Sequence, residues 1–142
     1  SVAGLIGSPQ MNFIDATVAK VSEGVTLSFE GQKVTVGGEK AKALIDAGYV
    51  GKTVVLGIRP EDVHEVGAPA ESKHLSDPIA VTVSVYELLG AGVMLYCDCG
   101  SSSVSASVNA ATPARAGSKI DVVFDVDKLH FFDKDTEQAI AH

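Results

Sequence analysis

The tripeptide Gly51-Lys52-Thr53 is the combination that ends phosphate-binding loops, where backbone amides and a lysine hold phosphates at the start of a helix. Such a loop also needs an earlier glycine, and the corresponding position is Asp46, whose carboxylate would face the phosphates. The order of elements is reversed too, because a helical pattern precedes the tripeptide and an apolar strand pattern follows it. We therefore interpret the tripeptide as a helix-to-strand turn and predict no nucleotide site.

Thiols and carboxylates that could bind a metal ion occur in two groups. Cys97-Asp98-Cys99 offers two thiolates, but a structural zinc site takes four ligands, usually from two pairs, and no second pair is at hand. The second group consists of aspartates between positions 121 and 135, and these lack the spacing of a calcium-binding loop. We interpret the cysteines as small residues on one face of a strand, and the acidic group as turn residues. No metal site is predicted; the acidic group, near His130, is Asp121, Asp125, Asp127, Asp133 and Asp135.

The hydroxyl nucleophiles and imidazoles form no recognisable catalytic pattern. No Gly-x-Ser-x-Gly elbow occurs, and Ser101-Ser102-Ser103 after Gly100 predicts a hairpin turn. None of the histidines lies in a His-x-x-x-His arrangement. We therefore predict no catalytic residue and no cofactor in this chain; the four histidines are His64, His74, His130 and His142.

The segment Gly57-Ile58-Arg59-Pro60-Glu61-Asp62 places a charged corner at the end of an apolar strand. The proline fixes φ after the strand ends, and the two acidic residues follow in a turn or a single helical turn. Two interpretations remain open at this point. The corner is either a salt-bridged structural feature or a contact surface.

These residues must be positioned by strands, because apolar and polar residues alternate with period two along much of the chain. Short strands separated by glycines are typical of a barrel or a sandwich with antiparallel pairing. Gly31-Gln32 predicts a tight hairpin. Residues 39–47 break the alternation and predict one short helix ended by Gly48, and residues 2–6 predict a helical turn. The alternating runs are 25–29, 79–85, 104–108 and 120–124.

The polar segment 67–78 contains two prolines and predicts a connector. It divides the chain into a first β unit at about 9–66 and a second at about 79–135. No sequence repeat relates the two. The units therefore either stand apart or share strands.

The composition excludes several classes of protein. Of the 142 residues, 46% are hydrophobic and 20% are charged, which is typical of a folded domain. The net charge of −7 disfavours nucleic acid as a partner. Two cysteines two residues apart on a strand are poorly placed for a mutual disulfide, which favours a reducing, cytosolic setting. Because the chain opens with Ser1 inside an apolar segment, we expect it to be part of a longer protein.

Three phrases occur in order at a spacing typical of one family: Gly-Ser-Pro-Gln-Met-Asn-Phe-Ile at 7–14, Gly-Ile-Arg-Pro-Glu-Asp-Val at 57–63, and Phe-Asp with His-Phe-Phe-Asp within 124–133. Together they resemble the C-terminal regulatory region of maltose-type ABC transporter ATP-binding subunits, the transport-associated OB-type (TOBE) domain. The resemblance spans nearly the whole chain. It implies a mostly β fold of OB-like barrel units with one short helix.

The same resemblance implies a set of motif residues that could form an interface. This sequence departs from the usual family pattern at Gly92, where an acidic residue is common. A contact that the family makes through that side chain is therefore in doubt. The motif residues are Gly7, Ser8, Pro9, Asn12, Phe13, Gly57, Arg59, Pro60, Glu61, Gly90, Phe124, Asp125, His130, Phe132 and Asp133.

The resemblance also implies what surrounds this chain. Residues 1–8 would be the junction from an N-terminal ATPase domain that binds ATP and Mg²⁺, and residues 9–142 would be a non-catalytic regulatory domain. Partners would be a second copy of the same domain, membrane-spanning permease subunits reached through the ATPase domain, and in some members a regulatory protein. The subunit would lie on the cytoplasmic face of the membrane, in a transporter that imports sugars.

A second hypothesis is a domain that binds a small oxyanion, because related OB-type domains bind molybdate. The hydroxyls of Ser101, Ser102 and Ser103 and the amides of glycine turns could bind such an anion. The negative net charge argues against this site.

Overall fold

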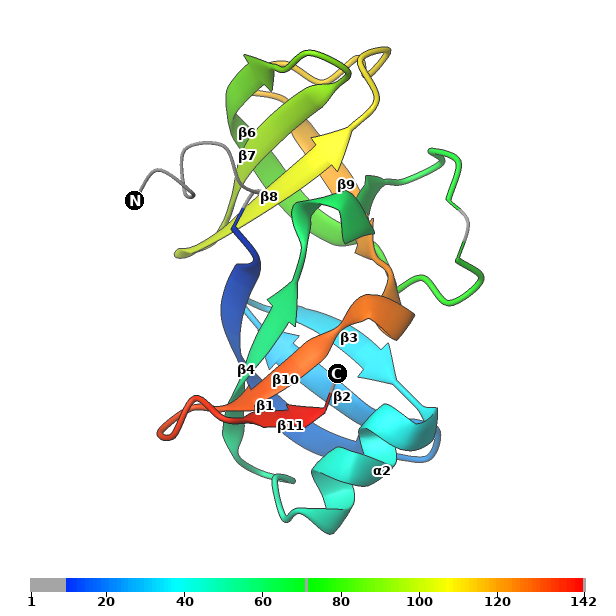
Figure 1. Ribbon diagram of the computed structural model, residues 1–142, viewed down its shortest axis with the longest axis vertical. Helices are drawn as coiled ribbons and strands as arrows, with labels where there is room; N and C mark the ends of the chain where they lie inside the picture. The colour runs from blue at the N-terminus through cyan, green and yellow to red at the C-terminus, as the bar shows by residue number, and fades with distance from the viewer. Residues whose placement is uncertain (1–9, 71, 142) are drawn as a thin grey trace.

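The computed structural model describes residues 10–70 and 72–141, and it consists of two barrel-like halves stacked end to end (Figure 1). The predicted mostly β, OB-like architecture with one short helix is confirmed. The predicted helical turn at 2–6, the junction 1–8 and the motif residues Gly7, Ser8 and Pro9 lie outside the described residues.

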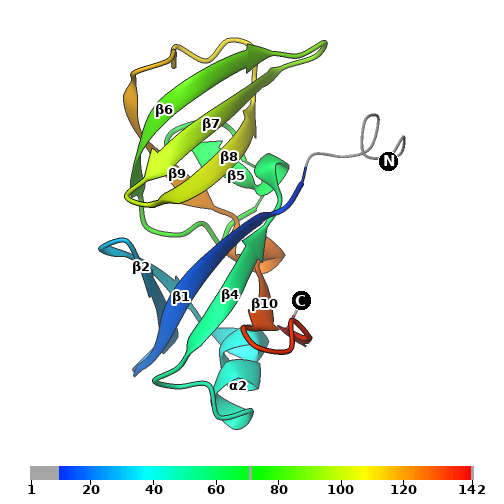
Figure 2. The ribbon, with the colours of Figure 1, turned by 90° about the vertical axis from the view of Figure 1, so that its left-hand side faces the viewer.

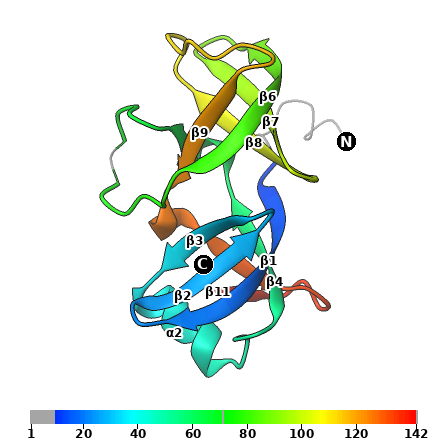
Figure 3. The ribbon, with the colours of Figure 1, turned by 180° about the vertical axis from the view of Figure 1, so that it is seen from behind.

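The first sheet contains six strands in the order β11-β10-β4-β1-β2-β3, all paired antiparallel. The meander of β1, β2 and β3 faces the viewer in Figure 3. The helix α2 (Gly38–Asp46) lies at the end of this barrel and buries Ala41 and Leu44. The strands are β1 (Asn12–Val21), β2 (Gly24–Phe29), β3 (Gln32–Val36), β4 (Thr53–Ile58), β10 (His130–Asp133) and β11 (Ala139–Ala141).

The second sheet contains five strands in the order β5-β9-β6-β7-β8, also antiparallel. It forms the upper barrel of Figure 1. The strands are β5 (Val63–Glu65), β6 (Ile79–Leu88), β7 (Val93–Cys99), β8 (Ser102–Val108) and β9 (Lys119–Phe124).

The two halves of the sequence exchange strands. β5 comes from the first half but pairs with β9 in the second sheet, whereas β10 and β11 come from the second half but extend the first sheet beside β4. Two short 3-10 helices make the crossings, η1 (Pro60–Asp62) between β4 and β5, and η2 (Val126–Lys128) between β9 and β10. The sheets therefore do not follow the division of the chain at the connector.

Several local predictions shift by one residue. The predicted helix at 39–47 runs from Gly38 to Asp46. The first hairpin turns at Glu30-Gly31, not at Gly31-Gln32, because these two residues adopt the positive φ angles (52° and 74°) that such a two-residue turn requires. Likewise, the β7–β8 turn occupies Gly100 and Ser101, and the strand resumes at Ser102.

The alternation predicted over 79–85 ends at an irregularity in β6. Ile79, Val81 and Val83 are buried as expected, but the register with β7 shifts between Val83 and Val85, and Val85 is 50% exposed. A bulge adds one residue to a strand and reverses the faces that follow. The shift therefore turns Val85 to the solvent face of the sheet.

One cluster of buried apolar side chains extends through both halves. At their junction the rings of Phe29, from β2, and Phe124, from β9, stack with centroids 6.2 Å apart and planes 4° apart. Stacked rings of this kind contribute beyond their burial of apolar area. The motif residue Phe124 thus belongs to the core that joins the two sheets.

Two polar contacts also join the halves. The buried side chain of Asn12 donates to the carbonyl of Ser105 (2.9 Å) and accepts from its backbone amide (2.8 Å), so that it pairs β1 with β8 as a strand would. At the other side, the carboxylate of Glu30 accepts from the amide and hydroxyl of Ser101 (3.1 and 2.7 Å) and from the hydroxyl of Ser102 (3.3 Å). These bonds hold the pKa of Glu30 below its ordinary value, chiefly through the Ser101 hydroxyl.

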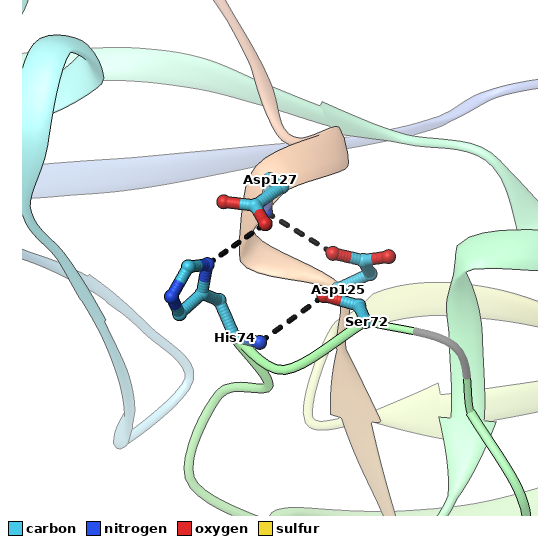
Figure 4. A network of polar contacts seen from close by, with 4 residues as sticks. All are labelled: Ser72, His74, Asp125 and Asp127. Atoms are coloured by element: carbon cyan, nitrogen blue, oxygen red, sulfur yellow. Dashed lines mark hydrogen bonds and ion pairs between the residues drawn. The ribbon is translucent and has the colours of Figure 1, made fainter.

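The connector is held against η2 by the polar network of Figure 4. His74 contacts the carboxylate of Asp127 through Nδ1 (2.8 Å), and its amide donates to the hydroxyl of Ser72 (3.1 Å). Asp125 accepts from the amide of Asp127 (3.1 Å) and so caps η2. Within the described ranges, no helix has the length and apolar character needed to cross a lipid bilayer.

Replacing Asn12 by Ala should lower the free energy of unfolding by about 2 kcal/mol, because two buried bonds are lost and the backbone of Ser105 is left unsatisfied. Urea denaturation measures this change. Ser105→Ala is the matched control, since Asn12 contacts only backbone atoms of that residue and the change should be nearly neutral. Equal losses in the two variants would contradict the role assigned to Asn12.

Candidate docking surface

Three strands of the first sheet bring the aromatic motif residues together. In the antiparallel register, Phe13 on β1 and His130 on β10 both face Gly57 on β4, and Phe132 faces Val55 one row away. Because side chains two residues apart share a face of a strand, these five residues lie on one surface. We call this surface, made of Phe13, Val55, Gly57, His130 and Phe132, the aromatic face.

The rings on the aromatic face contact one another. Phe13 and Phe132 meet edge to face, with centroids 5.9 Å apart and planes 70° apart, and His130 stacks on Phe132 at 6.4 Å. Phe13 remains 55% exposed although it is one of the largest apolar residues of the chain. Exposed aromatic residues that are already held by neighbours lose little conformational freedom on binding, which is typical of protein interfaces.

Gly57 is what allows Phe132 to lie over β4. A Cβ at this position would stand 2.7 Å from the sulfur of Met11 and 2.9 Å from Cε2 of Phe132. Both distances are shorter than real Cβ contacts, so a side chain here would displace the ring. The absence of a side chain at Gly57 thus sets the shape of the aromatic face.

An open hollow of about 380 Å³ borders the aromatic face. We call it the aromatic groove; it is lined by Phe13, Val55, Phe132, Asp133, Lys134 and Glu137. Its floor is apolar and its rim is charged, with an ion pair between Lys134 and Asp15 across the rim. This arrangement suits an apolar side chain of a protein partner flanked by polar groups.

The rim of the groove is fixed by Asp133. Its carboxylate accepts from the amides of Thr136 (2.8 Å) and Asp135 (2.9 Å) and from the hydroxyl of Tyr49 (2.7 Å). These bonds lower the pKa of Asp133 to about 2, with the amide of Thr136 as the largest cause and the hydroxyl of Tyr49 next. The β10–β11 turn, which forms the rim, is therefore anchored to the loop after α2.

Arg59 continues the surface beyond His130. Its guanidinium nitrogen Nη1 lies 3.1 Å from Nε2 of His130, and because a guanidinium can only donate, that imidazole nitrogen accepts. The side chain of Arg59 is exposed. The charged corner after β4 thus supplies a cation next to the aromatic face.

The remaining motif residues lie elsewhere. Asn12, Pro60, Phe124 and Asp125 are buried, and their contacts are within the fold. Glu61 is exposed on η1, and Gly90 lies at the exposed end of the β6–β7 hairpin.

Sequence reasoning missed Val55, Lys134 and Glu137. Val55 could have been found, because it lies two residues before Gly57 on the same strand and must share its face. Lys134 and Glu137 line the groove only because of how the β10–β11 turn folds, and no periodic pattern of residues predicts that fold.

The other residues that the sequence suggested as candidate sites are buried or make contacts within the fold. Gly51-Lys52-Thr53 forms the predicted helix-to-strand turn, and the amide of Gly51 donates to the carbonyl of Val18 (2.7 Å). Cys97 is buried on β7, and burial raises the pKa of its thiol to about 11. Within residues 10–70 and 72–141, no group of three or more Cys, His, Asp or Glu side chains is arranged to hold a metal ion. The Ser101 and Ser102 hydroxyls, proposed for an oxyanion, already bind Glu30.

Comparison with protein families gives two matches that together cover most of the chain. Residues 7–63 match the MalK OB fold domain, and residues 56–132 match the TOBE domain. The chain belongs to the TOBE domain family. The two matches overlap at 56–63, the segment in which this TOBE domain passes from one sheet to the other through η1.

Curated relatives of this TOBE domain include ATP-binding proteins whose names specify sugar import. It is 37% identical, over 98% of its length, to the oligosaccharides import ATP-binding protein MsmX of Bacillus subtilis. It is 35% identical, also over 98% of its length, to the trehalose/maltose import ATP-binding protein MalK of Thermococcus litoralis. In both cases the TOBE domain covers only 37% of the relative.

A solved structure shares the fold at low sequence identity. The cytoplasmic molybdate-binding protein ModG, with molybdate bound, superposes with a TM-score of 0.58 and 13% identity. The match covers 89% of the TOBE domain and 96% of the ModG chain. At this identity the likeness concerns the fold alone.

Gly57→Ala should destabilise the TOBE domain by about 1–3 kcal/mol, because the added methyl group must displace Phe132 and Met11. Gly90→Ala is the matched control, since a Cβ there meets nothing within 4 Å. Thermal unfolding and the ring-proton NMR signals of Phe132 report the two effects. An unchanged Phe132 environment in the Gly57 variant would contradict the packing described.

Stability conferred by Asp133 should depend on pH. Since its pKa is held at about 2, below the ordinary 3.8, its stabilising effect is complete above about pH 4 and is lost as the pH falls through about 2. The wild-type advantage over Asp133→Asn in urea unfolding should therefore shrink between these values. Asp135→Asn, which leaves the amide that contacts Asp133 in place, should show no such loss. A pH-independent difference would be the contradicting result.

Proposed function

We propose that this TOBE domain is the non-catalytic docking and dimerisation domain of the ATP-binding subunit of an ABC transporter that imports sugars. The observation that carries the proposal is similarity over 98% of the chain to ATP-binding proteins whose names specify oligosaccharide and trehalose/maltose import. A further relative, 37% identical, is the multiple sugar-binding transport ATP-binding protein MsmK of Streptococcus mutans.

ATP and Mg²⁺ would bind in another domain of the same subunit. In the described structure, the one phosphate-loop-like tripeptide follows a helix, and its first amide is bonded to Val18. Permease subunits would be reached through that other domain, on the cytoplasmic face of the membrane. The task left to the TOBE domain is contact with proteins.

The aromatic face fits this task better than it fits catalysis. It exposes Phe13 beside an apolar groove with a charged rim, and its rings are held in place by one another. Such a surface stabilises a protein partner by burying aromatic area. A second copy of the domain, a regulatory protein, or both in turn would bind there.

Phe13→Ser should weaken self-association of the domain at least about tenfold, which is the usual effect of removing an aromatic interface anchor. Sedimentation velocity over a range of concentrations measures this, for the chain alone and for the full-length subunit. Val66→Ser is the matched control, because Val66 is 52% exposed but lies outside the aromatic face.

Two results would overturn the proposal. One is a monomer at every concentration in both the chain and the full-length subunit. The other is ATP turnover by the purified chain that Lys52→Ala abolishes.

A further inference from the structure

The aromatic groove combines aromatic rings with acidic side chains. Figure 2 shows β1, β4 and β10 side by side, with the β10–β11 turn next to them. β1 and β10 supply the rings of Phe13 and Phe132, whereas the end of β10 and the turn supply the carboxylates of Asp133 and Glu137. Ring faces and carboxylates both attract cations, and a groove that has both offers a cation two separate contacts.

The rim of the groove has an excess of negative charge. Among the described residues that line the groove, Lys134 is the one basic residue, and it already forms an ion pair with Asp15. The carboxylates of Asp133 and Glu137 therefore line the hollow without a further cation to balance them. The charge that complements this rim is positive.

Asp133 is held in one position and in its charged form. The amides of Thr136 and Asp135 and the hydroxyl of Tyr49 use three of the roughly four acceptor sites of its carboxylate. The amide of Thr136 is the largest cause of the low pKa of Asp133, about 2, so this carboxylate is fully ionised at neutral pH. Asp133 thus gives the groove a fixed negative charge but has little capacity for another hydrogen bond.

Glu137 supplies the carboxylate that is free to bind. Among the described residues, no hydrogen-bond or ion-pair partner contacts its side chain. Its backbone has a positive φ of 63°, which favours glycine or asparagine, and its amide donates to the carbonyl of Asp133 (2.8 Å). Residues in such sparsely populated conformations occur preferentially at functional sites. A long acidic side chain at this position therefore points to a role for its carboxylate.

A guanidinium group fits these features better than an ammonium group does. It is planar, so it can stack on the exposed ring of Phe13, and its paired donors match the two carboxylate oxygens of Glu137. It is also more weakly hydrated, so it loses less on contact with the apolar surface of Val55. The groove is thus suited to the side chain of an arginine.

Both arginines of this chain are already engaged within the fold. Nη1 of Arg59 lies 3.1 Å from Nε2 of His130. Nη1 of Arg115 donates to the carbonyls of Thr112 (2.9 Å) and Ala114 (2.7 Å). A second copy would offer the same engaged arginines and would bring the same net charge of −7 to the acidic rim. These contacts favour an arginine from a different protein.

From these observations we propose that the aromatic groove binds an arginine side chain of a partner protein other than a second copy of this chain. The guanidinium stacks on Phe13 and pairs with the carboxylate of Glu137, and Asp133 adds a fixed negative charge beside it. The inference rests on the proposed docking role and specifies the chemistry of the partner that the groove takes.

Three capped tripeptides test the proposal: Ala-Arg-Ala, Ala-citrulline-Ala and Ala-Lys-Ala. Citrulline has nearly the shape of arginine but no charge. The ring-proton NMR signals of Phe13 should shift and saturate with the arginine peptide, and the citrulline peptide should bind at least about tenfold more weakly. The lysine peptide should also bind more weakly than the arginine peptide, because an ammonium group neither stacks as a plane nor pairs with both carboxylate oxygens.

Variants of the chain locate the binding. Glu137→Gln should weaken binding of the arginine peptide about tenfold, and Phe13→Leu, which keeps an apolar side chain but removes the ring, should weaken it about threefold or more. Asp135→Asn is the matched control, because it removes a carboxylate of the same turn that does not line the groove. Its affinity should stay within about twofold of the wild type. Circular dichroism spectra establish that each variant is folded.

Several outcomes overturn the inference and leave the docking role intact. They are Phe13 signals that the arginine peptide leaves unchanged, a citrulline or lysine peptide that binds equally well, and an Asp135 variant that is as weak as the Glu137 variant. Self-association that Arg115→Gln weakens, in a chain that does not bind the peptide, assigns the groove to a second copy and also overturns it. The docking role fails separately, if the chain and the full-length subunit both stay monomeric.

Discussion

The exchange of strands between the two sheets is the constraint on which the rest of the molecule depends. β5 completes the second sheet and β10 completes the first, so neither barrel can close until both halves of the chain are in place. Contacts between residues far apart in sequence make such folds slow to form but cooperative. The two crossings, through η1 and η2, join the barrels, which share one core.

The aromatic face is a product of this exchange. Phe13 and Val55 come from the first half of the chain, whereas His130 and Phe132 arrive on the strand contributed by the second half. The motif residues that are distant in sequence thus meet on three adjacent strands. All three phrases that identify the family contribute to this one surface, whereas Phe124 and Asp125 of the third phrase are buried.

Period-two alternation predicted β2, β6, β8 and β9, because burial of one face fixes the pattern of side chains. It could not predict the outward turn of Val85, since a bulge changes register without changing residue type. Alternation also could not assign β10 to a sheet, because pairing partners follow from topology and not from local sequence. Only some of the predicted motif residues lie together on the aromatic face. Lys134, on the rim of the groove, could not be predicted, because its position depends on the fold of the β10–β11 turn.

The contacts of Glu30 make it harder for an anion from solution to bind at the β7–β8 turn. Its carboxylate already occupies the amide and hydroxyls of the β7–β8 turn, on a chain segment that cannot diffuse away. A tethered group acts like a ligand at roughly millimolar concentration or above, so a dissolved competitor must exceed that level or bind more strongly. The two barrels are thereby kept in contact by a negative charge that the protein itself supplies.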